Sequence, residues 1–88
     1  METLEYKGQS YLVIGDYLGK LKIFDYDNMK LQVSINSHAK VINSLDICQD
    51  KLMIISGSSD TYLNVWQLKI KNKKVQKVSL KGSYHLDD

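Results

Sequence analysis

The sequence predicts an all-β fold built from short antiparallel strands. Apolar, β-branched and aromatic residues occur in short runs, several of which alternate with polar residues with a period of two. Clusters of Gly, Asn, Asp and Ser separate the runs at intervals of about ten residues, which is typical of strands joined by turns. No segment long enough for a helix carries an apolar stripe with a helical period.

In the first half of the chain, the predicted strands are 11–14, 21–24 and 31–35. Apolar residues at Leu4 and Tyr6 indicate a further strand before them. Gly15 and Gly19 bracket the first turn, where a glycine can supply the positive φ of a tight hairpin. Asp27-Asn28 predicts the next turn.

In the second half, the predicted strands are 41–47, 52–55 and 63–66. Asn36-Ser37, Gln49-Asp50 and the run 57–60 supply the turns around them. Six of the twelve lysines then fall between Lys69 and Lys81, and the chain has no arginine. We interpret this segment as a solvated hairpin whose lysines protect an exposed edge strand, in preference to a polyanion site.

The two halves form an internal repeat with an offset of 42 residues. When Gly15 is placed over Gly57, three further pairs align: Leu12 with Ile54, Leu21 with Leu63, and Phe24 with Trp66. A unit of about 40 to 45 residues with four strands is the spacing of a β-propeller blade. The lysine-rich hairpin contains about five extra residues compared with the first unit, since the turn at 36–38 is matched by 82–85.

The second unit carries a more specific pattern. His38 precedes strand 41–47 and lies 28 residues before Trp66, and Asp60 lies six residues before Trp66. In this spacing the chain resembles the WD40-repeat β-propeller family. Three positions depart from the family pattern: Ser37 replaces a glycine, Gln67 replaces the final aspartate, and the first unit has Phe24-Asp25 instead of Trp-Asp.

The resemblance implies a partial WD40-type propeller of about two four-stranded antiparallel blades, which belongs to a larger or multi-chain ring. Residues 1–37 would form the first blade, with its first strand truncated at the amino terminus. Residues 38–80 would form the second blade, and 81–88 would begin the next repeat or form a tail. Propellers have four or more blades, so a chain of 88 residues supplies too few for a ring.

By the same resemblance, four residues form a hydrogen-bonded structural tetrad in the second blade: His38, Ser56, Asp60 and Trp66. Three of these are also the residue types of a nucleophilic triad. A catalytic serine needs an exposed hydroxyl and an oxyanion hole, whereas Ser56 is expected in the middle of a strand before Gly57. We therefore favour the structural interpretation.

The resemblance also assigns candidate partner-facing positions on the narrower face of the propeller. They are Val41, Asn43 and Ser59 in the second blade and Tyr17 in the first. An exposed tyrosine is a typical interface anchor, so Tyr17 is the foremost candidate. Packing against the neighbouring blade is the competing role for this side chain.

The function implied by the resemblance is a non-catalytic scaffold for protein–protein interactions in a multi-protein assembly. Its partners would be other protein chains, including the remaining blades, and neither a membrane nor a small-molecule substrate is expected. No cofactor or metal is expected, because Cys48, His38 and His85 lack the spacing of metal ligands. The polar, acidic start and the single cysteine predict a cytoplasmic chain, with a cytoskeletal or ciliary location as a further hypothesis.

An alternative function is a small independent β-barrel that binds single-stranded nucleic acid. Its support is the lysines together with four interleaved tyrosines: Tyr6, Tyr11, Tyr17 and Tyr26. The absence of arginine, the usual residue for bidentate contacts to phosphates and guanine, argues against it.

Overall fold

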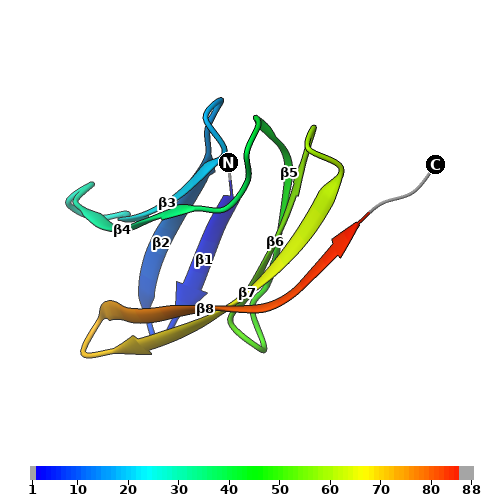
Figure 1. Ribbon diagram of the computed structural model, residues 1–88. Helices are drawn as coiled ribbons and strands as arrows, with labels where there is room; N and C mark the ends of the chain where they lie inside the picture. Colours follow the sequence, from blue (N-terminus) through cyan, green and yellow to red (C-terminus); the bar gives the residue numbers. More distant parts are fainter. Residues whose placement is uncertain (1, 86–88) are drawn as a thin grey trace.

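The computed structural model describes residues 2–85, which form two four-stranded antiparallel sheets and no helix (Figure 1). The first sheet contains β1 (Glu2–Tyr6), β2 (Gln9–Gly15), β3 (Lys20–Asp25) and β4 (Leu31–Asn36). The second contains β5 (Ile42–Cys48), β6 (Met53–Ser58), β7 (Tyr62–Lys71) and β8 (Lys74–His85). In each sheet the spatial order follows the sequence order. The predicted all-β architecture of two four-stranded units is confirmed.

The 42-residue repeat of the sequence is also a repeat of strand register. Val13 pairs with Ile23 in the first sheet, and Ile55 pairs with Val65 at the equivalent place in the second. The central hairpins of the two sheets are therefore equivalent residue by residue. The first strands differ in length, since β1 has five residues and β5 has seven.

The core lies between the two sheets. The first sheet contributes Leu4, Tyr11, Val13, Leu21 and Ile23, and the second contributes Ile42, Ile54, Trp66 and Leu68. The core contains Val13 from β2 and Ile54 from β6, but the repeat equivalent of Val13 is Ile55, the neighbour of Ile54. Neighbouring side chains of a strand point to opposite faces of the sheet. The two sheets therefore meet through opposite faces of the repeat unit. On the face of each sheet that points away from the core lies the repeat equivalent of a core residue. In the first sheet this is Leu12, the equivalent of Ile54, and in the second it is Ile55, the equivalent of Val13.

The second sheet is extended by the long hairpin of β7 and β8, which have 10 and 12 residues where β3 and β4 have six each. Two bulges, beside Trp66 and Ile70, accommodate unpaired residues of β8 and allow its pairing to continue. The pairing reaches His85, which lies opposite Tyr62.

This pairing corrects the predicted boundary after residue 80. Residues 81–85 belong to β8 of the second sheet and do not begin a third unit. The match of 82–85 to the turn at 36–38 is likewise wrong, because Gly82 lies within β8 opposite Val65. The rest of the predicted third segment, residues 86–88, lies outside the described residues. In the part of the chain described here, no helix is long and apolar enough to cross a membrane.

Candidate functional site

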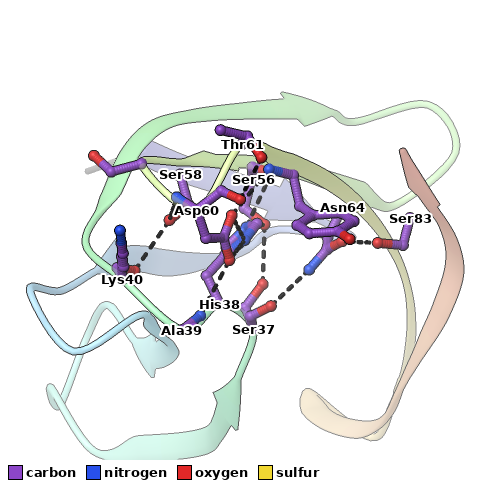
Figure 2. Close-up of polar contacts among 12 residues, drawn as sticks. Ser37, His38, Ala39, Lys40, Ser56, Ser58, Asp60, Thr61, Asn64 and Ser83 are labelled. Carbon is purple, nitrogen blue, oxygen red and sulfur yellow. Dashed lines mark hydrogen bonds and ion pairs between the residues drawn. The ribbon is translucent and has the colours of Figure 1, made fainter. Parts of the chain in front are cut away.

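A chain of hydrogen bonds passes through the buried side chains at the start of the second sheet (Figure 2). His38 lies in the segment between β4 and β5, and its imidazole is buried. Its Nδ1 lies 3.1 Å from Asp60 Oδ2, in the β6–β7 turn, and its Nε2 lies 2.9 Å from Ser56 Oγ on β6. Three members of the predicted tetrad therefore contact one another directly.

The fourth member, Trp66, reaches this group through a residue that the sequence analysis did not include. Trp66 Nε1 donates to Ser37 Oγ at 3.0 Å, and Ser37 Oγ lies 3.0 Å from Ser56 Oγ. Trp66 and Ser56 are thus bridged by Ser37. The only available signal was the replacement of a glycine by a hydroxyl residue directly before the buried histidine.

When the His38 proton is assigned to Nδ1, every donor and acceptor of this network has a partner. The indole N–H can only donate, so Ser37 accepts from Trp66 and its own proton is available for Ser56. Ser56 then donates to His38 Nε2, and the Nδ1 proton of His38 goes to the carboxylate of Asp60. We call these five residues the Trp–Asp network. Since every member is paired, the burial of these polar groups is compensated.

A second set of bonds attaches β8 to the same segment. Asn64 Nδ2 donates to the Ser37 carbonyl at 2.6 Å, and Ser83 Oγ donates to Asn64 Oδ1 at 2.7 Å. Asn64 is buried, and its amide anchors the backbone of Ser37, directly before His38. Neither Asn64 nor Ser83 was expected from the sequence.

The carboxylate of Asp60 also accepts hydrogen bonds from the backbone of two segments, the one after His38 and the one where β7 begins. The backbone N–H groups of Ala39 and Tyr62 donate to it at 3.1 and 2.9 Å. Burial alone would raise the pKa of Asp60, but these two hydrogen bonds and the His38 imidazole together hold it below its usual value.

Acid should therefore weaken the second blade through Asp60. A carboxyl group whose pKa is lower in the folded state contributes stability above its unfolded pKa, and this stability is lost as the pH falls through the folded pKa. We expect the free energy of unfolding to decline below about pH 4, and to decline less steeply in Asp60→Asn. Urea unfolding at a series of pH values measures both slopes, and equal slopes would contradict the assignment.

The first sheet has no counterpart of the Trp–Asp network. The residues equivalent to Ser56, Asp60 and Trp66 by the repeat are Ile14, Leu18 and Phe24. Its β2–β3 turn is instead organised by Asp16, whose Oδ1 accepts from the backbone of Leu18 and Lys20. The network is thus confined to one blade of the described residues.

The network has the elements of a triad without the exposure that catalysis needs. Ser56 is fully buried, and its hydroxyl lies between Ser37 and His38. A substrate cannot reach this oxygen without opening the sheet, so the arrangement fixes the chain segment around His38. Among the described residues there is also no group of three or more His, Cys, Asp or Glu that could hold a metal ion.

The four predicted partner-facing residues all lie at one end of the sheets. Tyr17 is 86% exposed, Val41 is half-buried, and Asn43 and Ser59 are exposed. Asn43 Nδ2 donates to Ser59 Oγ at 2.8 Å, and the Ser59 N–H donates to the Val41 carbonyl at 3.2 Å. We call this end, formed by residues 15–19, 37–43 and 58–62, the loop edge.

Tyr17 and Val41 share a hollow of about 410 Å³ on the loop edge, between the two sheets. Gly15, Asp16 and Ile42 complete its lining. The backbone of Ile42 donates to the Asp16 carbonyl at 3.2 Å, so a direct hydrogen bond connects the two blades here. Tyr17 forms one wall of this hollow, and most of its side chain is exposed.

Comparison with known proteins finds relatives whose names identify them as WD repeat proteins. No protein-family model matches the chain. It is 28% identical over 60 residues to WD repeat-containing protein 54 of Mus musculus, and 35% identical over 65 residues to WD repeat and SOCS box-containing protein 1 of Xenopus tropicalis. These matches cover 68% and 70% of the chain, but only 18% and 15% of the two relatives, so the chain spans less than a fifth of their length.

The fold has a counterpart among solved structures. The β-propeller domain of Myceliophteria thermophila Cps50 (Swd1) matches 85% of the chain with a TM-score of 0.75 and 15% sequence identity, and the match covers 24% of that domain's chain. The sequence relatives and the fold agree with the resemblance found in the sequence. The described residues have the fold of two β-propeller blades, and the sequence is similar to those of WD repeat proteins.

Proposed function

We propose that this chain forms two blades of a propeller that serves as a non-catalytic scaffold, and that its loop edge binds a protein partner. The observation that carries the proposal is that turns of both sheets, at the same end of the molecule, expose apolar side chains on a hydrogen-bonded backbone. Tyr17, Leu18 and Tyr62 are 86%, 73% and 44% exposed there. The Trp–Asp network and the Asp16 turn hold the backbone beneath them.

A rigid edge favours binding because little conformational entropy is lost when the partner docks. Aromatic side chains beside a hollow are also the usual anchors of protein interfaces. Association with proteins is therefore the function that this geometry supports best. A cytoplasmic location, and a cytoskeletal or ciliary one, remain predictions.

The remaining blades are proposed as further partners, in the same chain or in another. Each outward face carries the repeat equivalents of positions that are buried in the core. Ile55 and Val65 point away from the first sheet and are only half-buried, although their equivalents Val13 and Ile23 are fully buried. A further blade packed on this face would repeat the contact already present between the two sheets, in the head-to-tail manner that closes rings.

The alternative of an independent β-barrel that binds nucleic acid is not favoured. The eight strands form two separate four-stranded meanders and do not close into a barrel. One of the four tyrosines on which that alternative depended, Tyr11, is fully buried and offers no stacking surface.

Loss of the Tyr17 side chain is expected to weaken partner binding without unfolding the blades. In Tyr17→Ala we expect at least about a tenfold loss of affinity for a partner that co-purifies with the protein, as for other interface anchors. Tyr26→Ala is the matched control, because Tyr26 is 51% exposed in the β3–β4 turn at the opposite end of the sheet. Affinities from surface plasmon resonance that fall equally in both variants, or in neither, would overturn the assignment of the loop edge.

A further inference from the structure

A second hollow, of about 360 Å³, lies at the end of the molecule opposite the loop edge. The β1–β2 turn and the tip of the β7–β8 hairpin line it, and Figure 1 shows the β7–β8 hairpin running past the lower ends of β1 and β2. The extra length of β7 and β8 creates the enclosure, because Ile70 and Val75 of the extension pack against the core cluster. The walls include Tyr6, Lys7, Tyr11, Lys71, Asn72 and Lys73.

The hydroxyl of Tyr11 is the unusual group of this hollow. The Tyr11 side chain is fully buried, and its Oη has no hydrogen-bond partner within the described residues. Buried polar atoms are nearly always paired, so such an atom at a hollow indicates a missing partner. Burial, with a smaller effect of the Asp25 charge, raises the pKa of Tyr11, so the hydroxyl keeps its proton at neutral pH and is available as a donor.

The charged residues that line the hollow itself are all lysines, although the Asp25 carboxylate acts on the Tyr11 hydroxyl from outside it. Lys7, Lys71 and Lys73 line the hollow, and no acidic residue does so in the part of the chain that the structure describes. The Lys7 ammonium lies 5.4 Å from the centre of the Tyr6 ring, a cation–π distance that keeps it beside the hollow. Three lysines and Tyr11 therefore line the same hollow, and their ammonium and hydroxyl groups are all hydrogen-bond donors.

We infer that this hollow binds a phosphate group, either as the free ion or as the monoester of a small molecule. Phosphate carries close to two negative charges at neutral pH and offers several strong acceptor oxygens. It can accept from Tyr11 Oη while the three lysines neutralise it. A carboxylate would balance only one of the three charges, and its two oxygens match fewer of the donors. The volume leaves room for the organic part of a monoester against the Tyr6 ring.

Calorimetric titration of the purified protein at low ionic strength tests this inference. Inorganic phosphate and phenyl phosphate should each bind saturably at one site, and acetate at the same concentration should not. Lys71→Gln combined with Lys73→Gln should weaken phosphate binding by at least about tenfold, as expected for lost charged hydrogen bonds. Lys74→Gln combined with Lys77→Gln is the control, because these lysines belong to the same hairpin but do not line the hollow.

Equal losses in both lysine pairs, absence of phosphate binding, or equal binding of acetate would overturn the inference. Binding confined to a single-stranded RNA oligonucleotide, and weakened by both pairs, would also overturn it by indicating a diffuse polyanion surface.

Tyr11→Phe provides an independent measurement, because it removes only the hydroxyl. Without phosphate, the variant should unfold at a higher temperature than the unmodified protein, since an unpaired buried polar group is lost. Saturating phosphate should raise the unfolding temperature of the unmodified protein more than that of Tyr11→Phe. Affinity for phosphate should fall about tenfold in the variant. An equal rise in both proteins would show that the hydroxyl does not touch the ligand and would overturn the inference.

Discussion

Replacing His38 with alanine is expected to lower the free energy of unfolding by about 2 to 4 kcal/mol. With its proton on Nδ1, the imidazole accepts from the fully buried Ser56 Oγ and donates to Asp60, which is partly exposed. Its removal leaves the Ser56 hydroxyl without its acceptor and Asp60 without its imidazole contact. Trp66 is the only tryptophan, so its fluorescence during urea unfolding reports the transition directly.

A double-mutant cycle shows whether the five residues act as one network. Ser37→Ala leaves Trp66 Nε1 without its acceptor and removes one of the two side-chain partners of Ser56 Oγ, so it should also be destabilising. Because Ser37 and His38 both act through Ser56, the two losses should not add in the double variant. Tyr26→Ala combined with His38→Ala is the control and should be additive. Additive losses for Ser37 and His38 would contradict a continuous network.

Gly19→Ala is expected to destabilise the protein by about 3 kcal/mol, for two separable reasons. Gly19 has a φ of +82°, which an L-residue adopts at a cost. A Cβ at this position would also collide with the backbone carbonyl of His38. The close approach arises because the Gly19 carbonyl accepts from the N–H groups of Ser37 and His38, at 3.0 and 2.9 Å.

Gly8→Ala separates the two costs of Gly19→Ala. Gly8 has a nearly identical φ of +79°, but a Cβ there would meet no atom within 4 Å. We therefore expect Gly8→Ala to cost only about 1 kcal/mol, the backbone term alone. Chemical unfolding of the two variants measures the difference. Equal losses would show that the contact between the first hairpin and the His38 segment is not tight.

The repeat could be recognised in the sequence because its strands and its turns are both specified by neighbouring residues. Alternating apolar residues such as Val13 and Ile55 specify strands, and glycines such as Gly19 specify turns, without reference to the rest of the chain. The tetrad residues could be named by resemblance alone. The role of Ser37 could not, because it depends on how closely two segments 29 residues apart in the sequence, at Ser37 and Trp66, approach each other.

The end of the second blade was misplaced for a similar reason. Residues 82–85 have the composition of a turn, and a local pattern cannot show that two bulges keep them paired with β7. Bulges depend on the partner strand, so they are decided by the sheet and not by the segment itself.

The sequence by itself determined the all-β class, the 42-residue unit and the two four-stranded blades, because strand period and turn chemistry are properties of neighbouring residues. Only the tertiary structure decided that opposite faces of the two units meet, that Ser37 joins Trp66 to Ser56, and that the tip of the lysine-rich hairpin and Tyr11 line one hollow. Each of these depends on distances between segments far apart in the chain. Such distances are set by packing and by the pairing of buried polar groups.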